Sequence, residues 1–265
     1  MATIMIGELE IFYTEKGEGE TLVIFPDQLH ASHGYGDEID HFAERFHVLA
    51  FDYPETGRST REAKYHDEWA FDLWTFRADL ACHLLMDLGI ESAYAMGTFG
   101  GALAAFHFAG KQVRDHNLTI KGLIVDSVLA DMDGRTLHRA LDVREHYYVR
   151  NTKLLKEEHG DDWREVVDAD THWLRRLADR GGYAVADSIL NAIACPVLLT
   201  GHQKDPRTPG IAAEYARISR LIPDCTVYLA SASNHPYIEY PYMWSDRPGF
   251  RSLADRFFSQ HASKA

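Results

Sequence analysis

The sequence predicts an α/β fold in which helices cover both faces of a mostly parallel sheet. Two observations carry this prediction. Short apolar runs bounded by turn residues, which are typical of buried strands, recur along the chain. Longer segments with the spacing of amphipathic helices separate them, and this alternation favours a parallel sheet buried on both sides. With 265 residues, one such domain with a small insertion is expected.

The individual elements follow from these two patterns in chain order. TLVIFP (21–26) is an apolar run that ends at a proline, and FHVLAFDYP (46–54) has the same form. Between them, 37–46 carries apolar side chains at helical spacing. Applied to the whole chain, the patterns predict about eight strands, within 3–14, 21–26, 46–54, 92–97, 122–127, 196–201 and 226–231. They predict helices at 37–46, 74–90, 100–109, 209–223 and 247–260.

The alternation stops at 132–194, where the spacing is helical and no strand candidate occurs. We therefore expect an α/β core of residues 1–131 and 195–265 with a small helical cap inserted at 132–194. Its charged run KEEHGDD (156–162) is expected to be a solvated helix face. The aromatic side chains of the insertion either form its own small core, which we favour, or line a pocket: Tyr147, Tyr148, Trp163 and Trp173.

The charge of the chain limits its partners. The net charge is −13, from 27 Lys and Arg against 40 Asp and Glu. Nucleic acids and anionic membranes need clustered cations, so we expect neither as a partner and favour a small-molecule substrate or ligand. The oligomeric state has no signal in the sequence. No apolar run is long enough to span a bilayer, and the N-terminal segment has the pattern of strand and turn.

Cysteine and histidine spacing predicts neither a disulfide framework nor a metal site. Cys82, Cys195 and Cys225 lie far apart, without the short spacing of zinc ligands. His30 and His33 are the one close histidine pair we considered for a metal, and we favour ordinary loop residues. A reduced, cytoplasmic setting without metal or cofactor is therefore expected.

Four segments occur in an order that resembles one known family. They are FDYPETGRS (51–59), AMGTFGGALAAFHFA (95–109), KDPRTP (204–209) and SASNHPYIEYP (231–241). Together with the order of strands and helices, they resemble the α/β-hydrolase superfamily from Ile6 to the last helix. In that family the second segment is the turn that carries the nucleophile, the third the acid loop, and the fourth the loop of the catalytic histidine. In the first segment, Glu55 stands where glycine is common.

The nucleophile turn has phenylalanine where the family has serine. In the pattern G-x-S-x-G, the tip residue is strained, and the residues two before and two after it must be small. Gly97 and Gly101 flank Phe99 with this spacing. If Thr98 were the tip, Met96 would occupy a position that needs a small residue, and a β-branched residue tolerates positive φ badly. We therefore favour Phe99 over Thr98 at the nucleophile position.

The resemblance implies that the other two members of a catalytic triad are present. His235 matches the family's base and Asp205 the acid that orients it, while Asp126 is a less favoured acid. Phenylalanine has no nucleophilic atom, so the acyl-enzyme route through Phe99 is closed. An Asp–His pair can still act as a general base on water or directly on a substrate.

The resemblance also implies an oxyanion hole made by the backbone N–H groups of Gln28 and Gly100. The family usually has His-Gly before this position, whereas this chain has Pro26-Asp27. A carboxylate pointing into the hole would repel a developing oxyanion. We expect Asp27 to point to solvent instead, as an ordinary turn residue.

These features favour an enzyme that works without a nucleophile. It would use the Asp205–His235 pair as a general base on a small apolar carbonyl-containing molecule, as a lyase, decarboxylase or cyclase does. One alternative is an ester or lactone hydrolase that acts through Thr98 or a His-activated water. Another is a non-catalytic protein that binds a small molecule.

Overall fold

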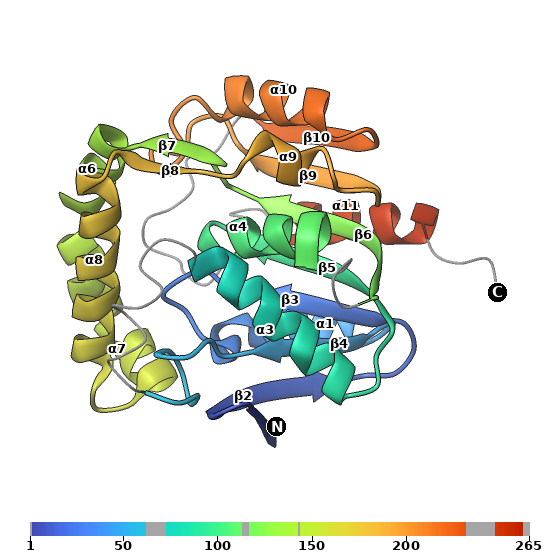
Figure 1. The fold of residues 1–265 in the computed structure, drawn as a ribbon, viewed down its shortest axis with the longest axis horizontal. Coiled ribbons are helices and arrows are strands. Elements are labelled where there is room, and N and C mark those ends of the chain that lie inside the picture. The colour runs from blue at the N-terminus through green and yellow to red at the C-terminus, as the bar shows by residue number, and fades with distance from the viewer. Residues whose placement is uncertain (1, 62–72, 113–116, 143, 232–246, 262–265) are drawn as a thin grey trace.

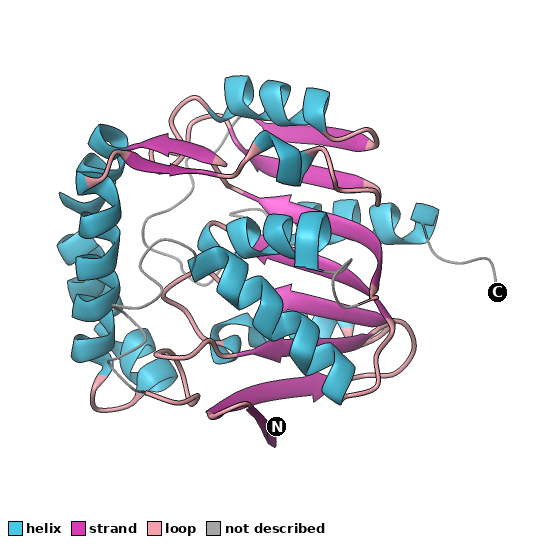
Figure 2. Cartoon of the chain, viewed as in Figure 1, coloured by secondary structure: helices cyan, strands magenta, loops and turns pink. Residues whose placement is uncertain are grey.

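The computed structural model describes residues 2–61, 73–112, 117–142, 144–231 and 247–261. Eight strands form one sheet in the order β1-β2-β4-β3-β5-β6-β9-β10, as Figures 1 and 2 show. The strands are β1 (Ala2–Ile6), β2 (Leu9–Lys16), β3 (Thr21–Phe25), β4 (His47–Phe51), β5 (Ser92–Thr98), β6 (Thr119–Asp126), β9 (Val197–His202) and β10 (Cys225–Ala230). β1 and β2 pair antiparallel, as do β2 and β4, and all other neighbours are parallel. The predicted fold class is confirmed.

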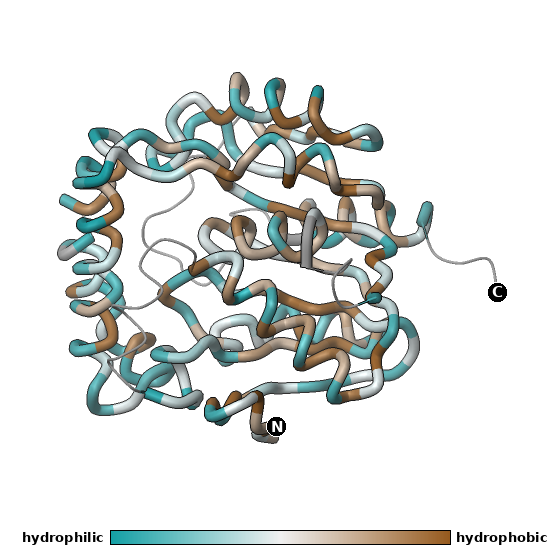
Figure 3. The backbone as a smooth tube through the Cα atoms, in the orientation of Figure 1, coloured by the Kyte–Doolittle hydropathy of each residue, from teal (hydrophilic) through white to brown (hydrophobic). Residues whose placement is uncertain are grey.

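Helices pack on both faces of this sheet because its central strands are apolar on both sides. In β3, Val23 and Phe25 belong to the same buried cluster as residues of α3 (Leu73–Asp87), α4 (Gly100–His107) and α10 (Ile211–Leu221). Leu22 and Ile24 point the other way and join the cluster that includes α1 (Gly36–Phe42) and α11 (Arg247–His261). Figure 3 shows the result as apolar strands between helices whose hydropathy alternates along the chain.

Strand register aligns the ends of the central strands. Phe25 of β3 pairs with Gly97 of β5, and Thr98 pairs with Asp126 of β6. The loop after β3, the turn after β5 and the loop after β6 therefore leave the sheet at one edge. Polar groups on these three connections meet there, which is where open α/β sheets place their ligands.

The insertion covers this edge of the sheet (Figure 1). It contains α6 (Gly134–Asp142), α7 (Arg144–His159) and α8 (Trp163–Asp179), as the helical spacing predicts. The short segments η1 (Ser32–Tyr35), η2 (Phe108–Gln112) and α9 (Asp187–Leu190) complete the described helices. Among the helices of the described residues, none is both long enough and apolar enough to cross a bilayer.

One expectation about strands was wrong. The insertion was expected to have none, yet β7 (Asp131–Asp133) and β8 (Gly182–Ala184) pair antiparallel. Three-residue strands are too short to show an alternating pattern, and their pairing partner lies far along the chain. The run 3–14, predicted to contain strands with short turns, is divided at Gly7, whose φ of +60° turns the chain between β1 and β2.

Candidate active site

Phe99 occupies the turn between β5 and α4, with φ 46° and ψ −115°. Backbone crowding explains why small residues surround it. A Cβ on Gly101 would lie 2.3 Å from the carbonyl oxygens of both Phe25 and Pro26, and a Cβ on Gly97 would lie 2.6 Å from the Gly101 oxygen. A non-glycine residue with positive φ is uncommon and stores strain. The structure therefore has the geometry of a strained strand-to-helix turn with Phe99 at its tip.

Thr98 has a different position from the one a nucleophile needs. It is the last residue of β5 and only 3% exposed. Its Oγ1 has no hydrogen-bond partner among the described residues, and its side chain is not among those that line the cavity described below. A substrate in that cavity would meet the Phe99 ring and not the Thr98 hydroxyl.

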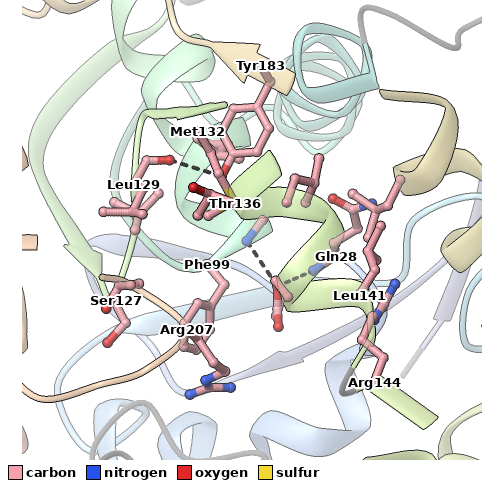
Figure 4. A pocket seen from close by; sticks show the side chains of 18 of the residues that line it. Gln28, Phe99, Ser127, Leu129, Met132, Thr136, Leu141, Arg144, Tyr183 and Arg207 are labelled. Carbon is pink, nitrogen blue, oxygen red and sulfur yellow. Dashed lines mark hydrogen bonds between the residues drawn. The ribbon is translucent and has the colours of Figure 1, made fainter. Parts of the chain in front are cut away.

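The Phe99 ring is covered by an arginine from the loop after β9. The Arg207 guanidinium carbon lies 3.9 Å from the ring centroid, and Figure 4 shows the two side chains together. A cation over an aromatic face is attracted by the ring quadrupole. No sequence pattern indicated this contact, because the two residues are far apart in the chain.

The Asp27 carboxylate fills the predicted oxyanion hole. Its Oδ1 accepts hydrogen bonds from the backbone N–H of Gln28 at 2.6 Å and of Gly100 at 2.9 Å (Figure 4). The expectation that Asp27 points to solvent was therefore wrong. Gly100 is the first residue of α4, and an anion at a helix N-terminus is stabilised by the unpaired N–H groups and the helix dipole. The two donors thus already hold a negative oxygen of the chain itself.

Asp205 and Asp126 have different surroundings. Asp205 is buried, and its Oδ1 accepts the Arg207 backbone N–H at 2.9 Å. The Arg207 guanidinium also lies 3.5 Å from both Asp205 oxygens, so this arginine connects the predicted acid to Phe99. Asp126 accepts the Thr200 hydroxyl at 2.7 Å between β6 and β9. His235 lies outside the described residues, so its pairing with Asp205 stays a prediction, as do the roles of Phe99, Gln28 and Gly100.

A cavity of about 570 Å³ lies between the ends of the strands and the cap. Much of its wall is apolar and comes from the segment after β6, α6 and α8: Val128, Leu129, Met132, Leu137, Leu141 and Leu174. Among the described residues, its charged side chains are Asp27 and three arginines, Arg139, Arg144 and Arg207. Such a wall suits a small molecule with an apolar body and a polar or anionic end.

Asp170 of α8 fixes the cap over the loop after β3. Its Oδ1 accepts a hydrogen bond from Gln28 Nε2 at 2.8 Å, and its Oδ2 lies 2.6 Å from the Arg144 guanidinium. Gln28 therefore contributes to the site twice, through its backbone N–H to Asp27 and through its side chain to the cap. This bridge makes the cap part of the site.

A second polar cluster borders the cavity. His30 Nδ1 lies 2.7 Å from Glu158 Oε2, and His30 Nε2 lies 3.1 Å from the Tyr147 hydroxyl. Burial raises the pKa of Glu158 to about 8 and lowers the pKa of His30 to about 3. This cluster was not expected from the sequence, because the charged run 156–162 has the pattern of a solvated helix face. That expectation was wrong for Glu158 and His159, which are buried.

The aromatic residues of the cap divide between the two alternatives. Tyr148 and Trp173 are buried and pack in hydrophobic clusters, and Trp163 packs against one of these clusters. Tyr147 packs against the same cluster as Trp163 and also lies in the cavity wall. The favoured interpretation, a small core of the insertion, thus describes Tyr148 and Trp163, whereas Trp173 joins the main hydrophobic cluster and Tyr147 fits both alternatives.

We expect the burial of Glu158 to make the protein less stable at alkaline pH. The pKa of its carboxyl rises on folding from 4.5 to about 8, so the folded chain keeps a proton that the unfolded chain releases. Its stabilising contribution is complete below about pH 4.5 and is lost as the pH rises to about 8. In urea titrations across this range, Glu158→Gln should reduce the fall in the free energy of unfolding by on the order of 1–3 kcal/mol.

The neighbouring Glu157 provides a matched control. Its side chain is 49% exposed, so Glu157→Gln should keep the pH dependence of the wild-type protein. Equal slopes for the wild type and Glu158→Gln would contradict the assignment of the alkaline instability to Glu158.

No protein-family model matches the sequence, and no curated protein matches it. Solved structures do match. An alpha/beta hydrolase enzyme from a Medee basin deep-sea metagenome library has a TM-score of 0.74 at 19% identity, covering 100% of this chain and 99% of that one. A thermophilic esterase from Thermogutta terrifontis has a TM-score of 0.68 at 18% identity, covering 96% of this chain and 95% of that one. An N-acyl homoserine lactone degrading enzyme also has a TM-score of 0.68 at 18% identity, covering 97% of this chain and 100% of that one.

These similarities extend over nearly the whole chain, and they agree with the observed sheet. Eight strands, mostly parallel, carry helices on both faces, and helices of an insertion cover the edge where the central strands end. At such low identity the comparisons establish the architecture, and the chemistry has to be argued from the site itself. The chain has the α/β-hydrolase fold.

Proposed function

We propose that this protein is an enzyme that acts on a small, largely apolar carbonyl compound by proton transfer, without a covalent acyl-enzyme intermediate. One observation carries the proposal: the Asp27 carboxylate occupies both N–H donors beside a phenylalanine tip. Acyl transfer needs a nucleophile at the tip and empty donors for the oxyanion. In the described site, the tip residue has no nucleophilic atom, and the Asp27 carboxylate already accepts hydrogen bonds from both N–H donors.

The base of the proposed reaction is His235, with Asp205 as the residue that orients it. Proton abstraction from a substrate C–H or O–H needs only a base within hydrogen-bond reach and no covalent step. The described site adds a second carboxylate, Asp27, which is held by two N–H donors and lines the cavity. Its fixed negative charge disfavours a substrate oxyanion beside it, so the reacting oxygen has to face another part of the wall.

The cavity supports a substrate with two ends. Its apolar wall would hold a hydrocarbon body, whereas Arg144 and Arg207 would attract a carbonyl or carboxylate oxygen. Arg207 also covers the Phe99 ring, so the phenylalanine contributes to positioning this arginine and to shaping the cavity.

A second candidate function is ester or lactone hydrolysis by a water molecule that His235 activates. It is favoured by the similar structures, which include an esterase and an enzyme that degrades N-acyl homoserine lactones. The version that uses Thr98 has less support, because that hydroxyl is buried outside the cavity wall.

A screen of the purified 265-residue chain tests the proposal. The panel contains β-keto acids, α-hydroxy ketones, lactones and aryl esters. We expect turnover of a keto acid or ketone, and His235→Ala should lower kcat about 10²–10⁴-fold, as removal of a general base does. His83→Ala is the control, since its side chain is 44% exposed and lies outside the cavity wall.

Three results would decide against the proposal. Turnover of lactones or esters alone would favour the hydrolase. Covalent labelling of the wild-type protein by a fluorophosphonate would show that a nucleophile is present after all. Thermal stabilisation by panel compounds without turnover, unchanged in His235→Ala, would show a binding protein.

A further inference from the structure

Three side chains from two segments, α7 and the loop after β3, form a hydrogen-bonded line that ends in the cavity wall. Glu158, near the end of α7, contacts His30, in the loop after β3, at 2.7 Å. His30 contacts Tyr147, near the start of α7, at 3.1 Å. The side chains of Glu158 and His30 are 0% and 2% exposed, and both His30 and Tyr147 line the cavity.

We propose that Glu158, His30 and Tyr147 form a proton relay that delivers a proton to an oxygen atom of a molecule bound in the cavity. The inference rests on the proposed function, in which a carbonyl oxygen gains negative charge. Asp27 occupies the two N–H groups that would otherwise stabilise that charge. The relay instead provides a proton donor, the Tyr147 hydroxyl, at another place in the same cavity wall.

The proton transfer balances without ionising the histidine or the tyrosine. In the loaded state, the Glu158 carboxyl donates its proton to His30 Nδ1, and His30 Nε2–H donates to the Tyr147 oxygen. A phenol oxygen can accept this hydrogen bond and still donate its own proton. Tyr147 gives that proton to the substrate oxyanion and takes the Nε2 proton, while His30 takes the carboxyl proton at Nδ1. Glu158 ends as a carboxylate, and the substrate oxygen ends as a hydroxyl.

The loaded state agrees with the burial of the cluster. Burial raises the pKa of Glu158 and lowers the pKa of His30, so a neutral carboxyl next to a neutral imidazole is favoured at neutral pH. Burial raises the pKa of Tyr147, the charge of Asp27 and that of Glu158 when it is ionised raise it further, and Arg207 opposes this shift. Tyr147 therefore stays protonated. The charges of Asp27 and Arg207, at the Phe99 end of the cavity, act on it.

Other charged or titratable groups face the relay from several elements, and they bear on its pH dependence. Those that act on Glu158 are His159, Asp52 and His33, and the Ala31 N–H also faces its carboxyl. Those that act on His30 are Asp27, Arg144, Asp170 and Arg207. The loaded state should be populated below about pH 8 and lost above it.

NMR of the full chain without ligand tests the relay directly. As the pH rises through about 8, the ¹³C shift of the Glu158 carboxyl should report deprotonation. Over the same range, the ¹⁵N shifts of His30 should show its proton moving from Nε2 to Nδ1 while the ring stays neutral. An imidazolium at neutral pH, or a tautomer that does not change with Glu158, would overturn the proposal.

Binding of pentafluorophenolate, an oxyanion with an aromatic body, provides the second test by ¹⁹F NMR. Tyr147→Phe should weaken its binding about tenfold or more, the effect of losing a hydrogen bond to a charged oxygen. Tyr148→Phe is the matched control, because that hydroxyl contacts Thr171 at 3.0 Å and should leave binding unchanged. Equal affinity of the wild type and Tyr147→Phe would overturn the relay.

These two measurements need no turnover, so the two proposals can fail separately. A relay that passes both tests in a protein without activity on the panel would stand, and the proposed function would fall. Turnover that His235→Ala removes, together with unchanged binding in Tyr147→Phe, would leave the proposed function standing and remove the relay.

Discussion

The double variant Phe99→Ser, Asp27→Gly is expected to react covalently with a fluorophosphonate, which the wild-type protein should not do. The first substitution places a hydroxyl at the tip of the strained turn, and the second frees the N–H groups of Gln28 and Gly100. Nucleophile and oxyanion donors are then both available, as acyl transfer requires. Mass spectrometry of the labelled protein measures the effect and identifies the modified residue.

The single variants separate the effect of the missing nucleophile at the tip from the effect of the carboxylate on the two N–H donors. Phe99→Ser alone keeps a carboxylate in the hole, and we expect it to react about 10²–10³-fold more slowly than the double variant, the effect of losing one oxyanion donor or more. Asp27→Gly alone should not be labelled. Adding His235→Ala to the double variant should abolish labelling, which tests that residue as the base. Labelling of the wild-type protein at Thr98, or equal rates for Phe99→Ser and the double variant, would contradict this account.

Gly101→Ala is expected to destabilise the protein by about 3 kcal/mol or more. Its Cβ would lie 2.3 Å from two backbone carbonyl oxygens, those of Phe25 and Pro26, and backbone atoms at the end of a central strand cannot move away as a flexible side chain can. The free energy of unfolding from urea titration measures the loss. The variant should also lose any activity found in the screen, because the loop that carries Asp27 and Gln28 would have to shift.

Gly36 provides the control for this substitution. It begins α1, it has ordinary negative φ, and a Cβ there would meet no atom within 4 Å. Gly36→Ala should therefore change the free energy of unfolding by no more than about 0.5 kcal/mol, or stabilise slightly, since alanine favours helix. A similarly small effect of Gly101→Ala would show that the turn is less crowded than the distances indicate.

Much of the architecture was predictable because it depends on local patterns. Apolar runs and helical spacing predicted the strands and helices of the core, including β5 and α4 on either side of Phe99. The residue with positive φ, Phe99, could also be predicted from its near neighbours in the sequence. Gly97 and Gly101 are the small residues that a crowded turn requires, and their spacing centres that turn on Phe99.

The content of the site depended on contacts between distant segments, which no local pattern encodes. Asp27 points inward because Gly100, far along the chain, presents an N–H at a helix start. Glu158 is buried because His30 and the cavity wall lie beside α7. β7 and β8 form only where two distant segments meet. The sequence by itself determined the order of the elements and the strained turn, since both follow from near neighbours. Only the tertiary structure decided which charged side chains face the cavity. Their placement depends on which hydrogen-bond donors and acceptors from distant parts of the chain are buried beside them.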